Sequence, residues 1–355
     1  MKSTIRQFAR AWTIGVTGWI LLACGCATEP ERIDSVTLHQ DALSFLKYAS
    51  SYPDNPVVRA QAIESLHEVA PRQGVPLFRE ALSDAHDGVR FAACMVLGEM
   101  RHEASRKQLA RAADAESRSV QAAALFALHR LGDTSRTTKL AELLLHDTDE
   151  ATRANAALVI GQLGEEGTIK LLDRAAQHDR SPLVRMQALE GMVRLGDESA
   201  GDRLTLHAHG GAGQWQVTAL LAVARSPLSN RIPLLESRLE HGEHLEIRLA
   251  AARGLGWNER DDGYELAVEA LNYEPPSVVI PAVSEDDAIN QMMRIRTMAA
   301  FALGAIGDER ALPALREAMA AANDIRIRLA AARAILEILN HTNPPTLMAV
   351  DVPEG

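Results

Sequence analysis

Three arginines and a tryptophan recur in this sequence at intervals close to multiples of 32 residues. Arg130, Arg194, Arg225 and Trp257 are separated in turn by 64, 31 and 32 residues. Arginine and tryptophan are enriched among the side chains that dominate protein–protein binding. In a chain of net charge −10, clustered arginines are suited to hold an acidic or extended segment of a partner protein. The alternative is an ordinary solvated helix face, with Trp257 covering the next loop.

Histidines also recur at this interval, which raises the question of a metal site. They are His146, His178, His209 and His241. Neighbouring helices lie about 10 Å apart, whereas zinc needs nitrogen ligands at about 2.0–2.1 Å. We therefore interpret these histidines as C-terminal helix caps, which bond the last carbonyl groups. A local cluster with His207 and His244 is the alternative. We predict no bound metal or other cofactor.

Other residue patterns associated with catalysis are weak. No Ser/His/Asp order, glycine-rich phosphate loop or paired-carboxylate motif rises above background. The three cysteines form no CxxC pair, and Cys94 is expected to be a small buried apolar residue. We therefore predict that the protein is not an enzyme.

An internal repeat positions all these residues. Nine segments contain an apolar residue followed by a long polar one, then Ala three positions later and an aliphatic residue or Met seven positions later, which places them on one helical face. The anchor pairs are Val58-Arg59, Val89-Arg90, Val120-Gln121, Thr152-Arg153, Val184-Arg185, Trp215-Gln216, Ile247-Arg248, Ile295-Arg296 and Ile327-Arg328. Their spacing is 31 or 32 residues, with one of 48. With a second helix upstream of each anchor, this period predicts an all-α solenoid.

The repeat resembles a known family. The segment IRTMAAFALGAIGDERALPALREAM, from Ile295 to Met319, is similar to the short HEAT-like repeat of the PBS-lyase type, which is also found in phycobilin lyases. The resemblance covers residues 37–340 and is specific for fold rather than for activity. It implies a right-handed α-solenoid of about nine two-helix repeats, with the second helices on the concave face.

One enzyme of this repeat class, deoxyhypusine hydroxylase, binds iron through His-Glu pairs. This sequence contains His67-Glu68 and His102-Glu103. In that family the pairs stand at the start of the second helix, where this chain has Arg59-Ala60. The two pairs here are out of register with that motif and with each other, so the iron site is not carried over.

The period is broken once, by an insertion at residues 272–291. It contains Pro275-Pro276 and Pro281, which disfavour helix. Insertions in repeat arrays fall in loops on one face, often a binding face. The insertion is therefore either a tolerated surface loop or a loop that closes over one end of the binding surface. Residues 341–355 are expected to form a disordered tail.

The N-terminus has the pattern of a bacterial lipoprotein signal peptide. Three basic residues precede an apolar stretch of 13 residues, from Ala11 to Ala23, which is too short to cross a hydrocarbon core of about 30 Å comfortably. The sequence Leu21-Leu22-Ala23-Cys24 resembles a lipobox. This implies a cleaved signal peptide over 1–23, lipidation of Cys24 and a tether over 24–36. Cys26 is a second candidate, and an ordinary secretory signal or an uncleaved anchor is the alternative.

Charge narrows the class of partner. Without the basic residues of the signal peptide the chain carries −13. Such a chain is poorly suited to phosphate backbones, so nucleic acid is excluded as the expected partner. Repulsion from anionic lipid leaves the lipid anchor as the expected membrane contact.

The sequence thus predicts a protein–protein interaction scaffold in the bacterial cell envelope. It would be lipid-anchored to the inner or outer membrane and would face the periplasm. The alternatives are a repeat protein with metal-dependent or lyase-like activity and a purely structural envelope component.

Overall fold

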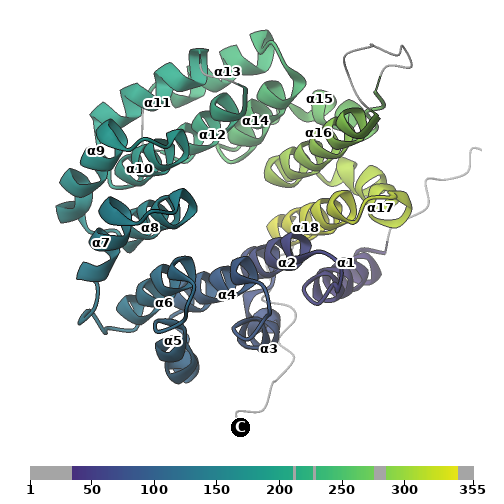
Figure 1. Ribbon diagram of the computed structural model, residues 1–355. Helices are drawn as coiled ribbons and strands as arrows, with labels where there is room; N and C mark the ends of the chain where they lie inside the picture. Colours follow the sequence, from purple (N-terminus) through teal and green to yellow (C-terminus); the bar gives the residue numbers. More distant parts are fainter. Residues whose placement is uncertain (1–33, 211–212, 227–228, 276–284, 343–355) are drawn as a thin grey trace, which may run out of the picture. The chain divides into compact units, whose positions relative to one another are not determined.

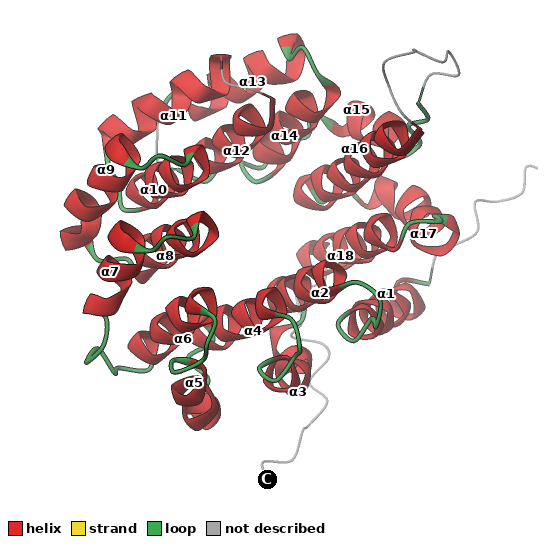
Figure 2. Cartoon of the chain, in the orientation of Figure 1, coloured by secondary structure: helices red, strands yellow, loops and turns green. Residues whose placement is uncertain are grey.

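The computed structural model describes residues 34–210, 213–226, 229–275 and 285–342. Within these ranges the chain consists of helices and connecting turns, without strands (Figure 2). The predicted all-α solenoid is confirmed. The expected signal peptide, most of the tether and residues 343–355 lie outside the described residues, whereas His341 and Thr342, expected in the tail, belong to the last helix.

Nine two-helix repeats make up the described part of the chain. The first helices are α1 (Ser35–Ala49), α3 (Pro71–Ala81), α5 (Arg106–Ala112), α7 (Thr138–His146), α9 (Ile169–His178), α11 (Glu198–Gly210), α13 (Arg231–His241), α15 (Tyr264–Leu271) and α17 (Leu312–Ala321). Short 3₁₀ turns at Glu103–Ser105, Glu166–Thr168 and Glu309–Ala311 precede α5, α9 and α17.

The second helices carry the anchor pairs and lie on the inside of the array (Figure 1). They are α2 (Pro56–Val69), α4 (Asp87–Glu99), α6 (Arg118–Arg130), α8 (Glu150–Leu163), α10 (Pro182–Arg194), α12 (Gly213–Ala224), α14 (Leu245–Gly256), α16 (Glu285–Ile306) and α18 (Ile325–Thr342). Each contacts the second helix of the next repeat. We call the surface that they present inward the inner face.

The core follows the repeated columns. The nine alanines that stand three residues after the anchors, from Ala62 to Ala331, are all fully buried. The aliphatic and methionine side chains at the seventh position are at most 3% exposed. Small residues at the alanine column let neighbouring helices approach closely, and the larger column fills the space between the two helix layers. The predicted helical register is therefore confirmed.

Glycine ends several second helices. Gly132, Gly164 and Gly196 each follow a leucine and have φ of 91°, 79° and 86°, the left-handed conformation typical of a helix C-terminus. Gly98 also follows a leucine but lies inside α4, where a Cβ would come within 2.7 Å of the Ala127 Cα. In that repeat Arg101 adopts the positive φ instead.

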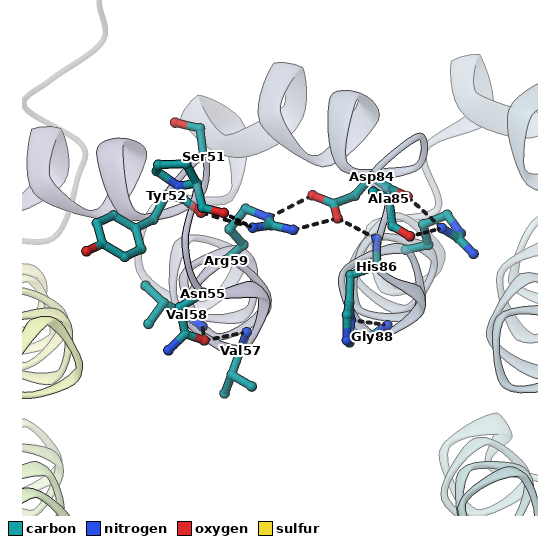
Figure 3. A network of polar contacts seen from close by, with 12 residues as sticks. Ser51, Tyr52, Asn55, Val57, Val58, Arg59, Asp84, Ala85, His86 and Gly88 are labelled. Carbon is teal, nitrogen blue, oxygen red and sulfur yellow. Dashed lines mark hydrogen bonds and ion pairs between the residues drawn. The ribbon is translucent and has the colours of Figure 1, made fainter.

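Ion pairs join neighbouring repeats on the turns between helices (Figure 3). Arg59 donates from Nε and Nη2 to the two carboxylate oxygens of Asp84 in the next repeat, each at 2.8 Å. The Asp84 carboxylate also accepts a hydrogen bond from the His86 amide at 2.8 Å. Arg153 and Asp179 repeat this arrangement. Asp84 stands six residues before Arg90 of its own repeat, but its carboxylate pairs with Arg59 of the preceding repeat and so links the two repeats.

This pairing predicts a local acid sensitivity. Burial raises the pKa of Asp84, but the hydrogen bonds from Arg59 and the His86 amide lower it more, so its net pKa lies below the ordinary value of 3.8. A carboxylate whose pKa is lowered by folding stabilises the fold above its unfolded pKa, and this contribution is lost as pH falls through the folded pKa.

We therefore expect Asp84→Asn to lower the free energy of unfolding by about 1–2 kcal/mol at pH 7. The difference from wild type should shrink once the pH falls below about 4. Urea denaturation at a series of pH values measures both effects. A difference that stays constant down to the lowest accessible pH would contradict the assigned ion pair.

The array closes on itself. The last helix, α18, packs against both α1 and α2, so the ninth repeat contacts the first as it would contact a following repeat (Figure 1). The Asn340 side chain donates a hydrogen bond of 2.8 Å to the Val69 carbonyl oxygen, and the Arg333 guanidinium forms an ion pair with Glu68. We call this contact between the ninth and first repeats the seam. The described helices of the predicted solenoid therefore form a closed ring rather than an open array.

The insertion is shorter as a loop than expected. Helix α15 ends at Leu271 and α16 begins at Glu285, so residues 285–291 are helical. Acidic residues at 285–287 favour a helix start there, because they lie at the positive end of the helix dipole. Residues 276–284, which include most of the loop predicted to close over one end of the binding surface, lie outside the described part. Among the described helices, none is both long and apolar enough to cross a membrane.

Candidate partner-binding face

Two columns of side chains line the inner face. The first stands nine residues after the anchors and contains the predicted Arg130, Arg194, Arg225 and Trp257. The second stands five residues after the anchors, one helical turn earlier on the same face. Its members in the last three repeats are Arg253, Phe301 and Arg333. Side chains of the two columns lie next to one another within and just after α12, α14, α16 and α18.

Five of these side chains form a continuous stack of guanidinium groups and rings. The Arg225 Cζ lies 3.9 Å from the centroid of the Trp257 ring, and the Arg253 Cζ lies 4.7 Å from the same centroid. Arg253 also lies over Phe301 at 4.6 Å, and Arg333 lies over Phe301 at 5.2 Å. We call these residues the arginine–aromatic stack. Cation–π attraction holds each guanidinium against a ring without neutralising its charge.

Two arginines of the stack have no carboxylate partner. In the described residues, neither Arg225 nor Arg253 forms a hydrogen bond or an ion pair, and the Arg253 Nε is buried without an acceptor. Burial, together with the nearby Arg333 charge, lowers the pKa of Arg253 to about 10, and the Glu337 charge opposes this shift only in part. Partial burial also lowers the pKa of Arg225, aided by Arg333 and Arg194 and opposed by Glu68. The inner face thus holds desolvated positive charge without a counterion from the protein.

The third arginine of the stack is neutralised at the seam. Arg333 is only 8% exposed and pairs with Glu68 of α2 and with Glu337, whose carboxylate accepts from Arg333 Nε at 2.8 Å. Burial lowers the pKa of Arg333, but the charges of Glu337 and Glu68 raise it more. A hollow of about 550 Å³ opens beside these residues, lined by Trp257, Glu68 and Glu337 among others.

Acidic side chains occupy another part of the inner face. Glu64 and Glu68 lie on α2, and Glu99 lies at the end of α4. The Glu64 side chain is exposed on the inner face. The protein around it still removes water from the carboxylate and raises its pKa, and the charges of Glu68 and Glu99 raise the pKa further. Glu99 is paired with His67 at 2.7 Å. We call Glu64, Glu68 and Glu99 the negative pole of the inner face. It adjoins the arginine–aromatic stack at the Arg333–Glu68 ion pair.

The predicted site residues are not all brought together. Arg225 and Trp257 are in direct contact. Arg194, the last residue of α10, is 44% exposed and donates a hydrogen bond of 3.4 Å to Glu190. Its charge lowers the pKa of Arg225. Arg130 ends α6, three inner helices before α12. Its Nε is buried without a hydrogen-bond partner.

Sequence reasoning missed Arg253, Phe301 and Arg333. A signal for them was present, because Arg253 precedes Trp257 by four residues and Arg333 precedes Glu337 by four. That spacing places both members of each pair on one helix face. Comparing the fifth-position column with the ninth would have identified them.

The candidate metal residues lie mostly at helix ends or pair with protein groups. His146, His178 and His241 are the last residues of α7, α9 and α13, and His209 lies one residue before the end of α11. In the described residues none of these four rings forms a hydrogen bond to a carbonyl oxygen, so the capping role stays a prediction. His67 pairs with Glu99, and the His102 ring shares a hydrogen bond of 2.8 Å with Ser105 Oγ. Within the described ranges, no group of three or more His, Cys, Asp or Glu side chains is arranged to hold a metal ion.

The repeated two-helix unit, its buried alanine column and its inward second helices define a helical repeat protein of the interaction class. A family model for HEAT repeats matches residues 43–129, 137–224 and 289–347, which together exceed half of the chain. The chain belongs to the HEAT-repeat family.

Three comparisons place it among known proteins. A HEAT repeat-containing taxis protein of Halobacterium salinarum is 28% identical over 173 residues, which are 43% of this chain and 42% of that protein. The chain therefore matches about two fifths of that relative's length. Human deoxyhypusine hydroxylase shows 15% identity over 86% of this chain and 98% of its own, with a TM-score of 0.36. The CpcE–CpcF complex of phycocyanin lyase from Nostoc shows 16% identity over 76% of this chain and 96% of its own, with a TM-score of 0.40.

Proposed function

We propose that this protein is a membrane-tethered scaffold that binds one or more other proteins on its inner face, facing the periplasm and without catalysis of its own. The tether is the lipid on Cys24, in either the inner or the outer membrane. The partner is a protein rather than a nucleic acid, and membrane contact is through the lipid only.

The observation that carries this proposal is the arginine–aromatic stack. Arginine and tryptophan in a partly desolvated cluster are the residue types that dominate protein–protein binding energies. HEAT-repeat arrays generally act by binding other proteins, which agrees with this surface. The negative net charge of the chain disfavours nucleic acid as the occupant.

The most direct test is crosslinking in native membranes followed by affinity purification of the full chain. A protein captured by wild type and lost from both Trp257→Ala and Arg194→Glu/Arg225→Glu, at matched melting temperature, supports the scaffold. Binding within a factor of two of wild type in both variants removes the inner face from consideration. Metal that co-purifies at one equivalent and raises the melting temperature would instead favour the metal-dependent alternative. Wild type without a specific partner would favour a purely structural envelope component.

The anchor makes a separate prediction. Cys24→Ala should abolish fatty-acid labelling and either release the protein from membranes or leave an uncleaved precursor, because the thiol that accepts the lipid is gone. Metabolic labelling with a fatty acid and membrane fractionation measure this, with Cys94→Ala, a free and buried cysteine later in the chain, as a control. Unchanged labelling of Cys24→Ala would move the site to Cys26, and absent labelling of wild type would remove the lipid anchor from the proposal.

A further inference from the structure

Among the described residues, the inner face has charged groups that other parts of the protein leave without a partner. Arg225 and Arg253 both lie over the Trp257 ring with no carboxylate or carbonyl oxygen bonded to them. On the negative pole, no hydrogen bond or ion pair to Glu64 is found in the described part of the chain, although Glu68 is paired with Arg333 and Glu99 with His67. Leaving a desolvated charge unpaired costs free energy, which a complementary ligand can recover.

The unpaired groups identify the chemistry of a ligand. Guanidinium groups bind planar carboxylates with charge-assisted hydrogen bonds, and they do so most strongly where water is excluded. Because the Arg225 and Arg253 guanidinium groups lie 3.9 and 4.7 Å from the centroid of the same indole ring, a carboxylate beside Trp257 can accept from both. The hollow lined by Trp257, Glu68 and Glu337 provides space for an entering chain.

The negative pole restricts which anions fit. A polyanion such as nucleic acid or a run of phosphates would meet Glu64, Glu68, Glu99 and Glu337 on the same inner face and be repelled. A segment carrying both signs avoids this repulsion, because a basic side chain can pair with Glu64 while an acidic one occupies the arginine pair.

We propose that Arg225 and Arg253, stacked on Trp257, form a carboxylate-binding site for a partner segment that carries an acidic and a basic side chain, with Glu64 receiving the basic one. This inference deepens the proposed scaffold function and rests on it for the choice of a protein as ligand. It moves the centre of the site from Arg130 and Arg194 to Arg253.

Stability and binding should respond in opposite directions at Arg253. Replacing it with Gln removes a desolvated charge that forms no hydrogen bond or ion pair in the described residues and that Glu337 and Glu68 offset only in part, so the melting temperature should stay equal or rise. The same change removes half of the arginine pair, so binding should weaken at least tenfold. If Arg253 had only a structural role, replacing it with Gln would instead lower the melting temperature of the protein. Arg225→Gln, at a more exposed position, gives a second variant should Arg253→Gln repack the ring.

The probes are fluorescently labelled peptides of equal length, one with Glu and Lys spaced by Gly and Ser, one with Glu only and one with Lys only. Fluorescence anisotropy with the full chain should show tightest binding of the mixed peptide. Arg253→Gln and Arg225→Gln should each weaken it at least tenfold, while Arg111→Gln, an exposed arginine on the outer helix α5, should leave it unchanged. Glu64→Gln should weaken the mixed peptide and leave the Glu-only peptide unaffected or tighter.

The outcomes separate this site from the scaffold itself. If no peptide binds wild type, or if Arg253→Gln and Arg225→Gln bind the mixed peptide as wild type does, the carboxylate site is overturned, and the scaffold still stands or falls on the native crosslinking. Inorganic phosphate that displaces the mixed peptide at concentrations where chloride has no effect would also overturn the carboxylate site. Such displacement would show that the site prefers phosphate to carboxylate. Peptide binding without any captured native partner would overturn the scaffold and leave the site.

Discussion

Gly161→Leu is expected to lower the free energy of unfolding by about 3 kcal/mol, at the upper end of the cost of overpacking a core. Gly161 lies in α8, where a Cβ would come within 2.5 Å of the Gly191 Cα on α10. The obstacle is backbone, which cannot rotate away as a side chain can. Leucine is about 1 kcal/mol more favourable than glycine within a helix, so the clash outweighs the helix preference. Urea denaturation measures the difference.

The matched control is Gly167→Leu, in the turn before α9. Gly167 is exposed and has no atom within 4 Å of an added Cβ, so the same substitution should change stability by less than about 0.5 kcal/mol. Hydrogen exchange should localise the damage to α8 and α10, since coupling in repeat arrays is between neighbours. Equal effects of the two substitutions would show that α8 and α10 do not approach as described.

Arg333→Leu is expected to lower the free energy of unfolding by about 2–3 kcal/mol and to act first at the seam. Removing one partner of a largely buried ion pair costs about 3–5 kcal/mol, because the remaining charge is left uncompensated. The cost here is smaller, since Glu68 is 44% exposed and water can solvate it. Hydrogen exchange should therefore speed up in α1 and α18 before other helices.

The control for the seam is Arg326→Leu on the same helix. Arg326 pairs with Asp324, two residues away, and that pair joins no other repeat. A double-mutant cycle with Glu68→Gln isolates the contact across the seam from the pair with Glu337. If the cycle shows no coupling, or if Arg326→Leu loosens α1 as much as Arg333→Leu does, the seam ion pair does not hold the ring.

Much of the fold follows from local sequence pattern. The anchor pairs, the alanine column and the glycines after α6, α8 and α10 predict helices, their register and their ends, because each depends on a few consecutive residues. Arg225 and Trp257 were found in the same way, since a column at fixed spacing keeps one helix face. The pairing of Asp84 with Arg59 rather than with Arg90 could not be predicted in this way, because spacing along the chain does not say which neighbouring turn lies nearer in space.

Ring closure could not be predicted from these patterns. The contact of α18 with α1 depends on the small rotation between adjacent repeats, accumulated over the whole array. Side-chain volumes at every interface set that rotation, and no single motif records it. The pairing of Arg333 with Glu68 joins residues 265 positions apart, so neither residue type nor spacing indicated it. Arg253 was missed for a simpler reason, since it belongs to the column five residues after the anchors, whereas the predicted site was drawn from the ninth-position column alone.

The seam also changes how the array can come apart. In an open row of repeats the two outermost units have one neighbour each, and unfolding frays inward from them. Here each repeat is held on two sides, so releasing any one of them requires two interfaces to break. Ordering the chain into a ring costs loop-closure entropy once, which grows only slowly with the length of the loop. The expected behaviour is a single sharp unfolding transition with a high kinetic barrier, in place of the stepwise loss of units from an exposed terminus.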